Sequence, residues 1–120
     1  MAFVLFVDYD SLTLQLMTRM VQMLGHEVVC DPSPRRALQW AAQNQPGLIL
    51  VDLNMMEISG VEFVRALRQK RETSALPVFI FSASRDAEDL EMALQAGANG
   101  YLFKPLNFDD LSKVIRQYLP

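Results

Sequence analysis

Residues that could carry out chemistry stand directly after four short apolar runs of this sequence. They are, in chain order, Asp8-Tyr9-Asp10, Asp52-Leu53-Asn54, Ser82-Ala83-Ser84 and Lys104-Pro105. Together these groups supply carboxylates, hydroxyls and one lysine. If the folded chain brings the four run ends together, several carboxylates share a site with one ammonium group.

The chemistry of such a site follows from its charges. Two carboxylates about 4 Å apart repel each other by roughly 4 kcal/mol at a surface-like dielectric, and a divalent cation or a lysine removes that cost. Magnesium fits because it prefers carboxylate and carbonyl oxygens and keeps some of its waters. A metal ion beside Lys104 would also neutralise the oxygens of a phosphoryl group in transfer. Since an aspartate can accept that group as an acyl phosphate and Ser82 can donate a hydrogen bond to it, the residues predict an aspartyl-phosphate site.

A parallel sheet would place these run ends side by side. The apolar runs are mostly continuous, as in strands buried on both faces, and longer helical patterns separate them. They cover Phe3 to Val7, Glu27 to Cys30, Leu48 to Val51, Val78 to Phe81 and Gly100 to Phe103. Alternation of strand and helix, repeated five times, predicts an α/β fold: a doubly wound, five-stranded parallel sheet with helices on both faces. In an open sheet of this kind ligands bind beyond the carboxyl ends of the strands, where the polar residues stand.

The helical patterns have recognisable beginnings and ends. In the first, leucine or methionine recurs every four residues from Leu12 to Leu24, and Gly25 follows as a stop. Serine or asparagine stands where three other helices would begin, and Gly97 stands where the fourth would end. The predicted capping residues are Ser33 before Pro34, Ser59 before Gly60, and Asn107 before Phe108. No linker or repeat interrupts this order, so we expect one domain over residues 1–120.

The composition argues against several other classes of protein. Hydrophobic residues make up 51% of the chain and charged residues 21%, so a folded core is expected rather than disorder. The net charge of −3 and the lack of a basic cluster argue against direct nucleic-acid binding. No apolar run is long enough to span a membrane, and the single cysteine, Cys30, is expected to pack as a small core residue. We therefore expect a cytoplasmic protein that contacts neither nucleic acid nor membrane directly.

In this order and at these spacings, the motifs make the chain resemble the receiver domain of two-component response regulators over essentially its whole length. The segments that carry the resemblance are Val7 to Asp10, Leu50 to Met55, Phe79 to Ala83 and Ala96 to Pro105. The resemblance implies the flavodoxin-like strand order 2-1-3-4-5. It also implies a signalling phosphoprotein rather than a classical enzyme, one that takes phosphate from a donor and later loses it again.

The resemblance also implies roles in phosphoryl transfer. Asp52 would be the phosphoacceptor, supplied by a sensor histidine kinase, by a phosphotransfer protein of a phosphorelay, or by a small phosphodonor. Lys104, before a cis bond to Pro105, would contact the phosphoryl group, and Ser82 would move toward it. Tyr101 would then swing inward and change the face formed by the fourth helix, fifth strand and fifth helix, where a downstream effector binds.

The implied magnesium site departs from the family pattern. Asp8, Asp52 and the backbone carbonyl of Asn54 would hold the ion. Tyr9, however, stands where the family usually has a second acid, and a phenol is neutral at pH 7 and a poor magnesium ligand. Asp10 could compensate, because residues two apart on an extended chain face the same way, or it could instead cap the first helix.

The loop after Asp52 departs from the pattern as well. Met56 replaces the family's usual proline, and Ser59 replaces the aspartate that commonly precedes Gly60. We expect the loss of proline to free the loop and to shift the carbonyl of Asn54 at a modest cost. Ser59 can still cap the third helix.

Three other functions compete with this interpretation. Asp8-x-Asp10 resembles the nucleophile motif of haloacid-dehalogenase-type phosphatases, with Asp8 as nucleophile and Asp10 as acid and base, although Leu12 stands where threonine or valine is usual. A flavodoxin would need a hydroxyl-rich phosphate loop after the first strand, and Asp8 and Asp10 would repel its phosphate. The third is a receiver-like interaction module that binds partners through the same face without phosphate, because Tyr9 has weakened the metal site.

The wider context of the domain stays open at this point. The 120 residues contain no DNA-binding or enzymatic segment, so we expect either a stand-alone receiver or the N-terminal piece of a longer protein. A homodimer is one option for its assembly.

Overall fold

Strands and helices alternate along the chain in the order that the apolar runs predict. The computed structural model describes residues 3–55 and 57–120, and within them five strands and five helices follow one another. The strands are β1 (Phe3–Val7), β2 (Glu27–Asp31), β3 (Leu48–Asp52), β4 (Val78–Ser82) and β5 (Gly100–Phe103). The helices are α1 (Ser11–Met23), α2 (Pro34–Asn44), α3 (Gly60–Gln69), α4 (Ala87–Ala96) and α5 (Phe108–Tyr118). Each strand is followed by a helix, as predicted.

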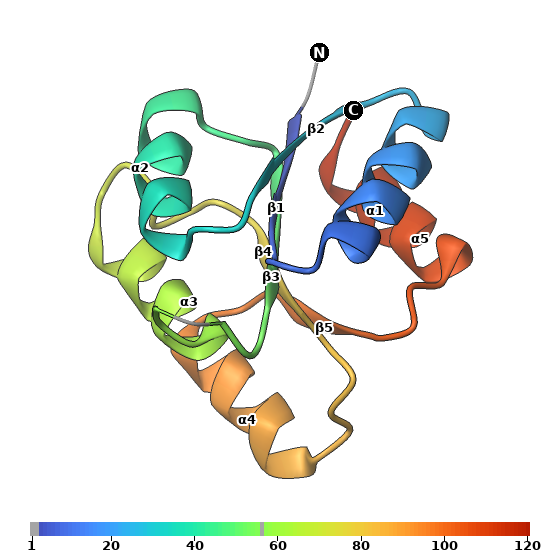
Figure 1. The fold of residues 1–120 in the computed structure, drawn as a ribbon. Coiled ribbons are helices and arrows are strands. Elements are labelled where there is room, and N and C mark those ends of the chain that lie inside the picture. Colours follow the sequence, from blue (N-terminus) through green and yellow to red (C-terminus); the bar gives the residue numbers. More distant parts are fainter. Residues whose placement is uncertain (1–2, 56) are drawn as a thin grey trace.

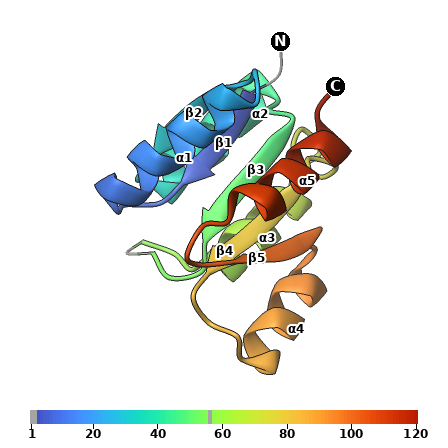
Figure 2. The same ribbon diagram turned by 90° about the vertical axis from the view of Figure 1, so that its right-hand side faces the viewer.

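The strands form one parallel sheet in the order β2-β1-β3-β4-β5. Helices α1 and α5 cover one face of this sheet, and α2, α3 and α4 cover the other (Figure 1). Figure 2, turned by 90°, shows α1 and α5 in front of the strands. The doubly wound α/β fold and the strand order implied by the resemblance are confirmed.

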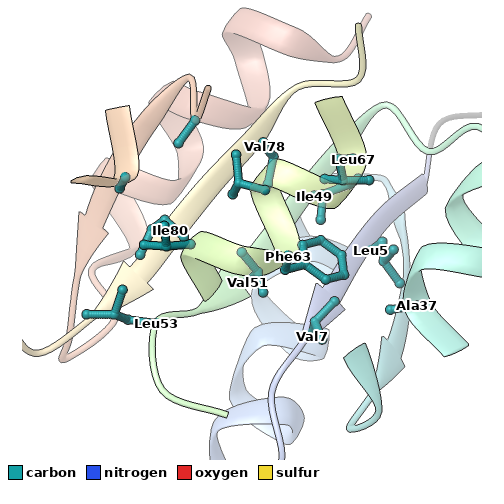
Figure 3. Close-up of a cluster of buried hydrophobic side chains, with 14 of the residues drawn as sticks. Leu5, Val7, Ala37, Ile49, Val51, Leu53, Phe63, Leu67, Val78 and Ile80 are labelled. Carbon is teal, nitrogen blue, oxygen red and sulfur yellow. The ribbon is translucent and has the colours of Figure 1, made fainter. Parts of the chain in front are cut away.

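Apolar side chains fill both faces of the sheet. Successive strand residues point to opposite faces. Leu5 and Val7 therefore belong to the cluster on the α2 and α3 side, and Val4 and Phe6 to the cluster on the α1 and α5 side. Figure 3 shows the first cluster, in which Phe63 of α3 lies over side chains of β1 and β3. Burial on both faces explains why the strand sequences are continuous apolar runs.

Three strands run one residue further than the apolar runs predict. Asp31, Asp52 and Ser82 are the last residues of β2, β3 and β4. The parallel ladder continues through them, with Asp52 opposite Phe81 and Ser82 opposite Phe103. A polar residue can end a strand when its backbone still pairs with a neighbouring strand, so hydropathy alone places these ends too early. As a result, the sheet itself holds Asp52 and Ser82.

Helix α1 is predicted correctly, but its buried side is not the row of residues that recurs every four positions. Leu12 and Leu16 are 72% and 44% exposed, whereas Met17 and Val21 are buried. An α-helix completes a turn in 3.6 residues, so a strict four-residue row winds around the helix instead of following one side. The row therefore leaves the core side at its N-terminal end.

The predicted helix ends are confirmed. Ser33, Ser59 and Asn107 are the N-cap residues of α2, α3 and α5, and their side chains accept hydrogen bonds from backbone N–H groups of the first turn. Gly25 and Gly97 follow α1 and α4 with φ of 85° and 111°, a region that glycine adopts without steric cost.

Two further expectations can be compared with the described residues, and a third concerns a residue outside them. Cys30 is only partly buried and packs at the edge of the α1 and α5 cluster, so it is not a full core residue. Within residues 3–55 and 57–120, no helix is long and apolar enough to cross a membrane. The expectation for the loop at Met56 concerns a residue that lies outside the described ones.

Candidate functional site

Asp8, Asp52 and Lys104 meet at the carboxyl ends of β1, β3 and β5. The Nζ of Lys104 lies 3.3 Å from Oδ2 of Asp8 and 3.3 Å from Oδ1 of Asp52. Lys104 follows the edge strand β5 and passes over β4, where its Nζ lies 5.2 Å from the centre of the Phe81 ring. The peptide bond between Lys104 and Pro105 is cis, as the resemblance implies. The structure thus brings together the acceptor candidate, one metal-ligand candidate and the lysine.

Both carboxylates of this cluster are buried. Asp8 is 1% and Asp52 7% exposed, whereas Lys104 is partly buried. Burial and the neighbouring charge of Asp8 raise the pKa of Asp52, and the ammonium of Lys104 offsets only part of this. Burial alone would lower the pKa of Lys104, but the charges of Asp52 and Asp8 outweigh it and raise that pKa. Two acids and one lysine leave a net negative charge that attracts a cation.

Asp10 does not join this cluster. It is the N-cap of α1, and its carboxylate accepts hydrogen bonds from the backbone N–H and the hydroxyl of Thr13. The hydrogen bond from the Thr13 hydroxyl lowers the pKa of Asp10. The backbone N–H of Asp10 donates to Oδ1 of Asp8 at 3.0 Å, where the chain turns out of the strand. The extended alternation that would put Asp10 beside Asp8 ends at this turn, and the capping alternative describes the structure.

Two carboxylates are left for a cation. Among the residues that the structure describes, no cluster of three or more His, Cys, Asp or Glu side chains could hold a metal ion. Tyr9 is 56% exposed and lies at a surface pocket that Ser33 and Glu57 also line. Asn54 is exposed as well, and the resemblance assigns its backbone carbonyl, not its side chain, to the ion. Magnesium is often held by one or two carboxylates with waters and phosphate oxygens, so this smaller donor set still fits it.

The two residues predicted to switch lie toward the opposite face of the sheet from the acids. Alternation along β3 and β4 puts Asp52 on the α1 and α5 side and Ser82, which is 3% exposed, on the α3 and α4 side. Tyr101 packs against the cluster on that second side, and its hydroxyl is buried without a hydrogen-bond partner among the described residues. The Tyr101 ring therefore already occupies an inward position, and its movement on phosphorylation stays a prediction.

The contacts that hold the loop after Asp52 were not predicted from the sequence. The carboxylate of Glu57 accepts a hydrogen bond from the Ser33 hydroxyl at 3.0 Å and lies 3.5 Å from Nε of Arg35. These contacts join the β3–α3 loop to the start of α2. The only signal in the sequence is a pair of opposite charges, Arg35 in the first turn of α2 and Glu57 in the β3–α3 loop, and their spacing does not show that they meet.

Sequence comparisons point to one family. A family model described as the response regulator receiver domain matches residues 4–116. The polar-differentiation response regulator DivK of Brucella ovis is 29% identical over 116 residues, which cover 97% of this chain and 94% of DivK. The transcriptional regulatory protein PrrA of Mycobacterium bovis is 35% identical over 116 residues, which cover 97% of this chain and 49% of PrrA.

Solved structures share the fold. The chemotaxis protein CheY4 of Vibrio cholerae matches with a TM-score of 0.91 at 31% identity, covering 99% of both chains. The receiver domain of the sensor histidine kinase PA1611 of Pseudomonas aeruginosa matches with a TM-score of 0.89 at 24% identity, covering 98% of this chain and 96% of that one. That second structure has a magnesium ion coordinated in its active-site cleft.

Proposed function

The chain belongs to the response regulator receiver domain family of two-component signalling, and we propose that it accepts a phosphoryl group on Asp52. The observation that carries this proposal is the pair of 3.3 Å contacts from Lys104 to Asp52 and Asp8 at the carboxyl edge of the sheet. A carboxylate nucleophile, a second acid and an ammonium group converge there on one point. That convergence is what transfer of a phosphoryl group to an aspartate requires.

The proposed transfer uses the carboxylate of Asp52 as nucleophile. One of its oxygens attacks phosphorus, and the bond from phosphorus to the oxygen or nitrogen of the donor breaks, with the electron pair leaving on the donor. The product is an acyl phosphate on Asp52. Lys104 stays protonated, because the two carboxylates raise its pKa, and its ammonium can pair with the phosphoryl oxygens. Hydrolysis later returns Asp52 and inorganic phosphate, so we regard the domain as a signalling acceptor rather than a classical enzyme.

We assign Asp8, Asp52 and the backbone carbonyl of Asn54 as ligands of a magnesium ion at this edge. When bound, the ion supplies positive charge that offsets the carboxylates and the incoming phosphoryl group. Magnesium in the cleft of the PA1611 receiver domain, which has the same fold, supports this choice of metal. Because Tyr9 adds no carboxylate and Asp10 caps α1, we expect weaker binding than at a site with three acids.

The proposed partners follow from the reaction. A sensor histidine kinase or a phosphotransfer protein would supply the phosphoryl group, and a downstream effector would read the result. We place the effector on the face formed by α4, β5 and α5, where Tyr101 and Phe103 line a surface pocket with Lys113. We place the protein in the cytoplasm, where its phosphodonors are made.

A second candidate function is a receiver-like interaction module that needs no phosphate. Two observations favour it: Tyr9 removes a carboxylate from the site, and the hydroxyl of Tyr101 is already buried. The other two alternatives are not carried forward, because the chain belongs to the receiver family. A dehalogenase-type phosphatase would moreover need Asp10 as its acid and base, and that side chain faces Thr13.

Intact-protein mass after incubation with acetyl phosphate distinguishes the two candidates. We expect a magnesium-dependent phosphoryl adduct in the wild type and none in Asp52→Asn. Asp110→Asn, which neutralises an exposed acid of α5, is the matched control and should keep the adduct. A folded wild type that takes up no phosphate with or without magnesium would favour the interaction module. Uptake by Asp52→Asn at the wild-type stoichiometry would show that the acceptor is another residue.

A further inference from the structure

Helix α4 has a smaller fraction of buried residues than the other helices in the described part of the chain. Only Ala93 of its ten residues is buried, whereas α3, of equal length, buries five. Met92 and Leu94 are 46% and 52% exposed. Figure 2 shows α4 at one end of the sheet, beside β5 and away from α1. A short helix with so little buried apolar surface depends on the contacts at its two ends.

The C-terminal end of α4 is anchored to α3. Nε of Arg68 donates to the carbonyl of Gly97 at 3.0 Å, and its Nη2 donates to Oδ1 of Asn99 at 3.0 Å. Nη1 of the same guanidinium donates to the carbonyl of Leu76 at 2.8 Å. These bonds fix the α4–β5 turn against the α3–β4 loop, so this end of the helix cannot move independently.

The N-terminal end of α4 is joined to the candidate site through Ser84. The hydroxyl of Ser84 donates to Oδ2 of Asp89, in the first turn of α4, at 2.6 Å. The backbone N–H of Ser84 donates to Oγ of Ser82 at 3.1 Å. Two consecutive hydrogen bonds, which we call the serine link, therefore run from the buried hydroxyl at the end of β4 to the helix.

The serine link can transmit a movement of Ser82. A hydroxyl has two acceptor lone pairs and one donor hydrogen, so Ser82 can keep accepting from Ser84 while it donates to a phosphoryl oxygen. A shift of Ser82 toward Asp52 then pulls the backbone of Ser84 along. Since Ser84 also holds Asp89, that shift acts on the first turn of α4.

We propose that Ser84 is the positioning residue that couples Ser82 to α4. Before phosphorylation, its hydroxyl holds the first turn of α4 through Asp89. When Ser82 moves toward a phosphoryl group on Asp52, Ser84 follows and its bond to Asp89 breaks. The N-terminal end of α4 is then released, while Arg68 keeps the C-terminal end in place. The trigger of this movement rests on the proposed function, whereas the contact between Ser84 and Asp89 does not.

Hydrogen–deuterium exchange of the unphosphorylated full chain tests the contact itself. Ser84→Ala and Asp89→Ala should each raise amide exchange in the first turn of α4 by about fivefold, the size expected for the loss of one hydrogen bond, and leave α3 unchanged. The Ser84 hydroxyl also accepts a hydrogen bond from the backbone N–H of Asp86 at 3.3 Å, which Asp89→Ala leaves in place. The double variant should show no further rise over Ser84→Ala, because that change already removes the bond to Asp89. Glu88→Ala is the matched control, since it removes an exposed acid from the same turn. Wild-type exchange in Ser84→Ala would overturn the proposal, as would an equal rise in Glu88→Ala.

Exchange after addition of acetyl phosphate and magnesium tests the coupling. In the wild type, exchange in the first turn of α4 should rise when intact mass shows the adduct. In Ser84→Ala it should be fast before and after, although the adduct still forms. A Ser84→Ala protein that carries the adduct and shows the same phosphate-dependent rise as the wild type would overturn the coupling. If the wild type takes up no phosphate, the proposed function fails, and the comparison without phosphate still decides whether Ser84 holds α4.

Discussion

Asp8 and Asp10 lie two residues apart in the sequence, yet they occupy different environments. Asp8 is buried at the end of β1 and pairs with Lys104. Asp10 is exposed and caps α1 through Thr13. The chain leaves the sheet between the two acids, so the alternation that makes neighbours of residues two apart ends there. In this domain the strand ends build the site, whereas the turn residues serve the helix that follows.

The point where the chain leaves β1 also separates the site residues that are present from the carboxylate that is missing. On the strand side, Asp52 and Lys104 keep the groups that phosphoryl transfer needs. On the turn side, Tyr9 is exposed and adds no carboxylate. We therefore expect the phosphoryl chemistry to be kept and the affinity for magnesium to be reduced.

Loss of the buried acid should have the largest effect. Asp8→Asn removes one of the two carboxylates proposed to hold magnesium, so we expect the magnesium dissociation constant to rise on the order of a hundredfold. Isothermal titration calorimetry with magnesium chloride measures the change. Asp10→Asn is the control and should bind magnesium as the wild type does. Equal losses in the two variants would contradict the division between Asp8 and Asp10.

A carboxylate at position 9 should change the magnesium affinity in the opposite direction. Tyr9→Asp adds a charged oxygen ligand, and we expect the magnesium affinity to rise about tenfold. Without magnesium this variant should be less stable than the wild type, because a third acid repels Asp8 and Asp52. Tyr9→Phe, which removes the hydroxyl and adds no charge, serves as control in the same titration. Similar affinities in the two variants would mean that Tyr9 does not limit the site.

Truncation of the exposed acid should affect folding and leave the site intact. Asp10→Ala removes the N-cap of α1, so we expect Tm to fall by about 4 °C. Asp10→Asn can still accept the hydrogen bonds from Thr13 and should retain most of the stability. Thermal unfolding followed by circular dichroism measures both variants. A loss of magnesium affinity in Asp10→Ala as large as that in Asp8→Asn would place Asp10 in the metal site.

The smallest effect should be the difference in Tm between the wild type and Asp52→Asn as pH changes. The pKa of Asp52 is raised in the folded protein, so folding disfavours its charged form and stability falls as pH rises from about 3.9, the unfolded value, through the folded pKa. Without magnesium, Asp52→Asn should therefore have the higher Tm at pH 7. The difference should shrink as pH falls through the folded pKa and vanish only below about 3.9, where Asp52 is protonated in both states. A wild type more stable than Asp52→Asn at pH 7 without magnesium would contradict the assigned environment.

The sequence predicts the sheet better than it predicts which sides of the helices are buried. The strands can be found because residues such as Val4 and Leu5 are buried on opposite faces, which makes the run continuous. Leu12 and Leu16 fit a helical row but are exposed, since hydropathy does not separate core residues from apolar surface residues. The end of β3 at Asp52 was predicted one residue early, because a polar side chain does not reveal that its backbone is still paired.

The candidate site also contains residues that the sequence predicts and contacts that it does not. Asp8, Asp52 and Lys104 could be predicted because they stand where strands end, and parallel pairing brings those ends to one edge. Contacts between a loop side chain and the helix that follows, such as Ser84 with Asp89, could not be predicted. Loop geometry decides which polar groups of two segments meet, and no periodicity in the sequence reports it.

Borohydride reduction identifies the residue that carries the phosphoryl group, which we propose to be Asp52. Wild type treated with acetyl phosphate and magnesium is reduced with sodium borohydride, which converts an aspartyl phosphate to homoserine, and is then digested for peptide mass spectrometry. We expect homoserine at position 52, with Asp8 and Asp10 unchanged. Homoserine at position 8 or 10, or a phosphoryl adduct that leaves no homoserine anywhere in the chain, would contradict it.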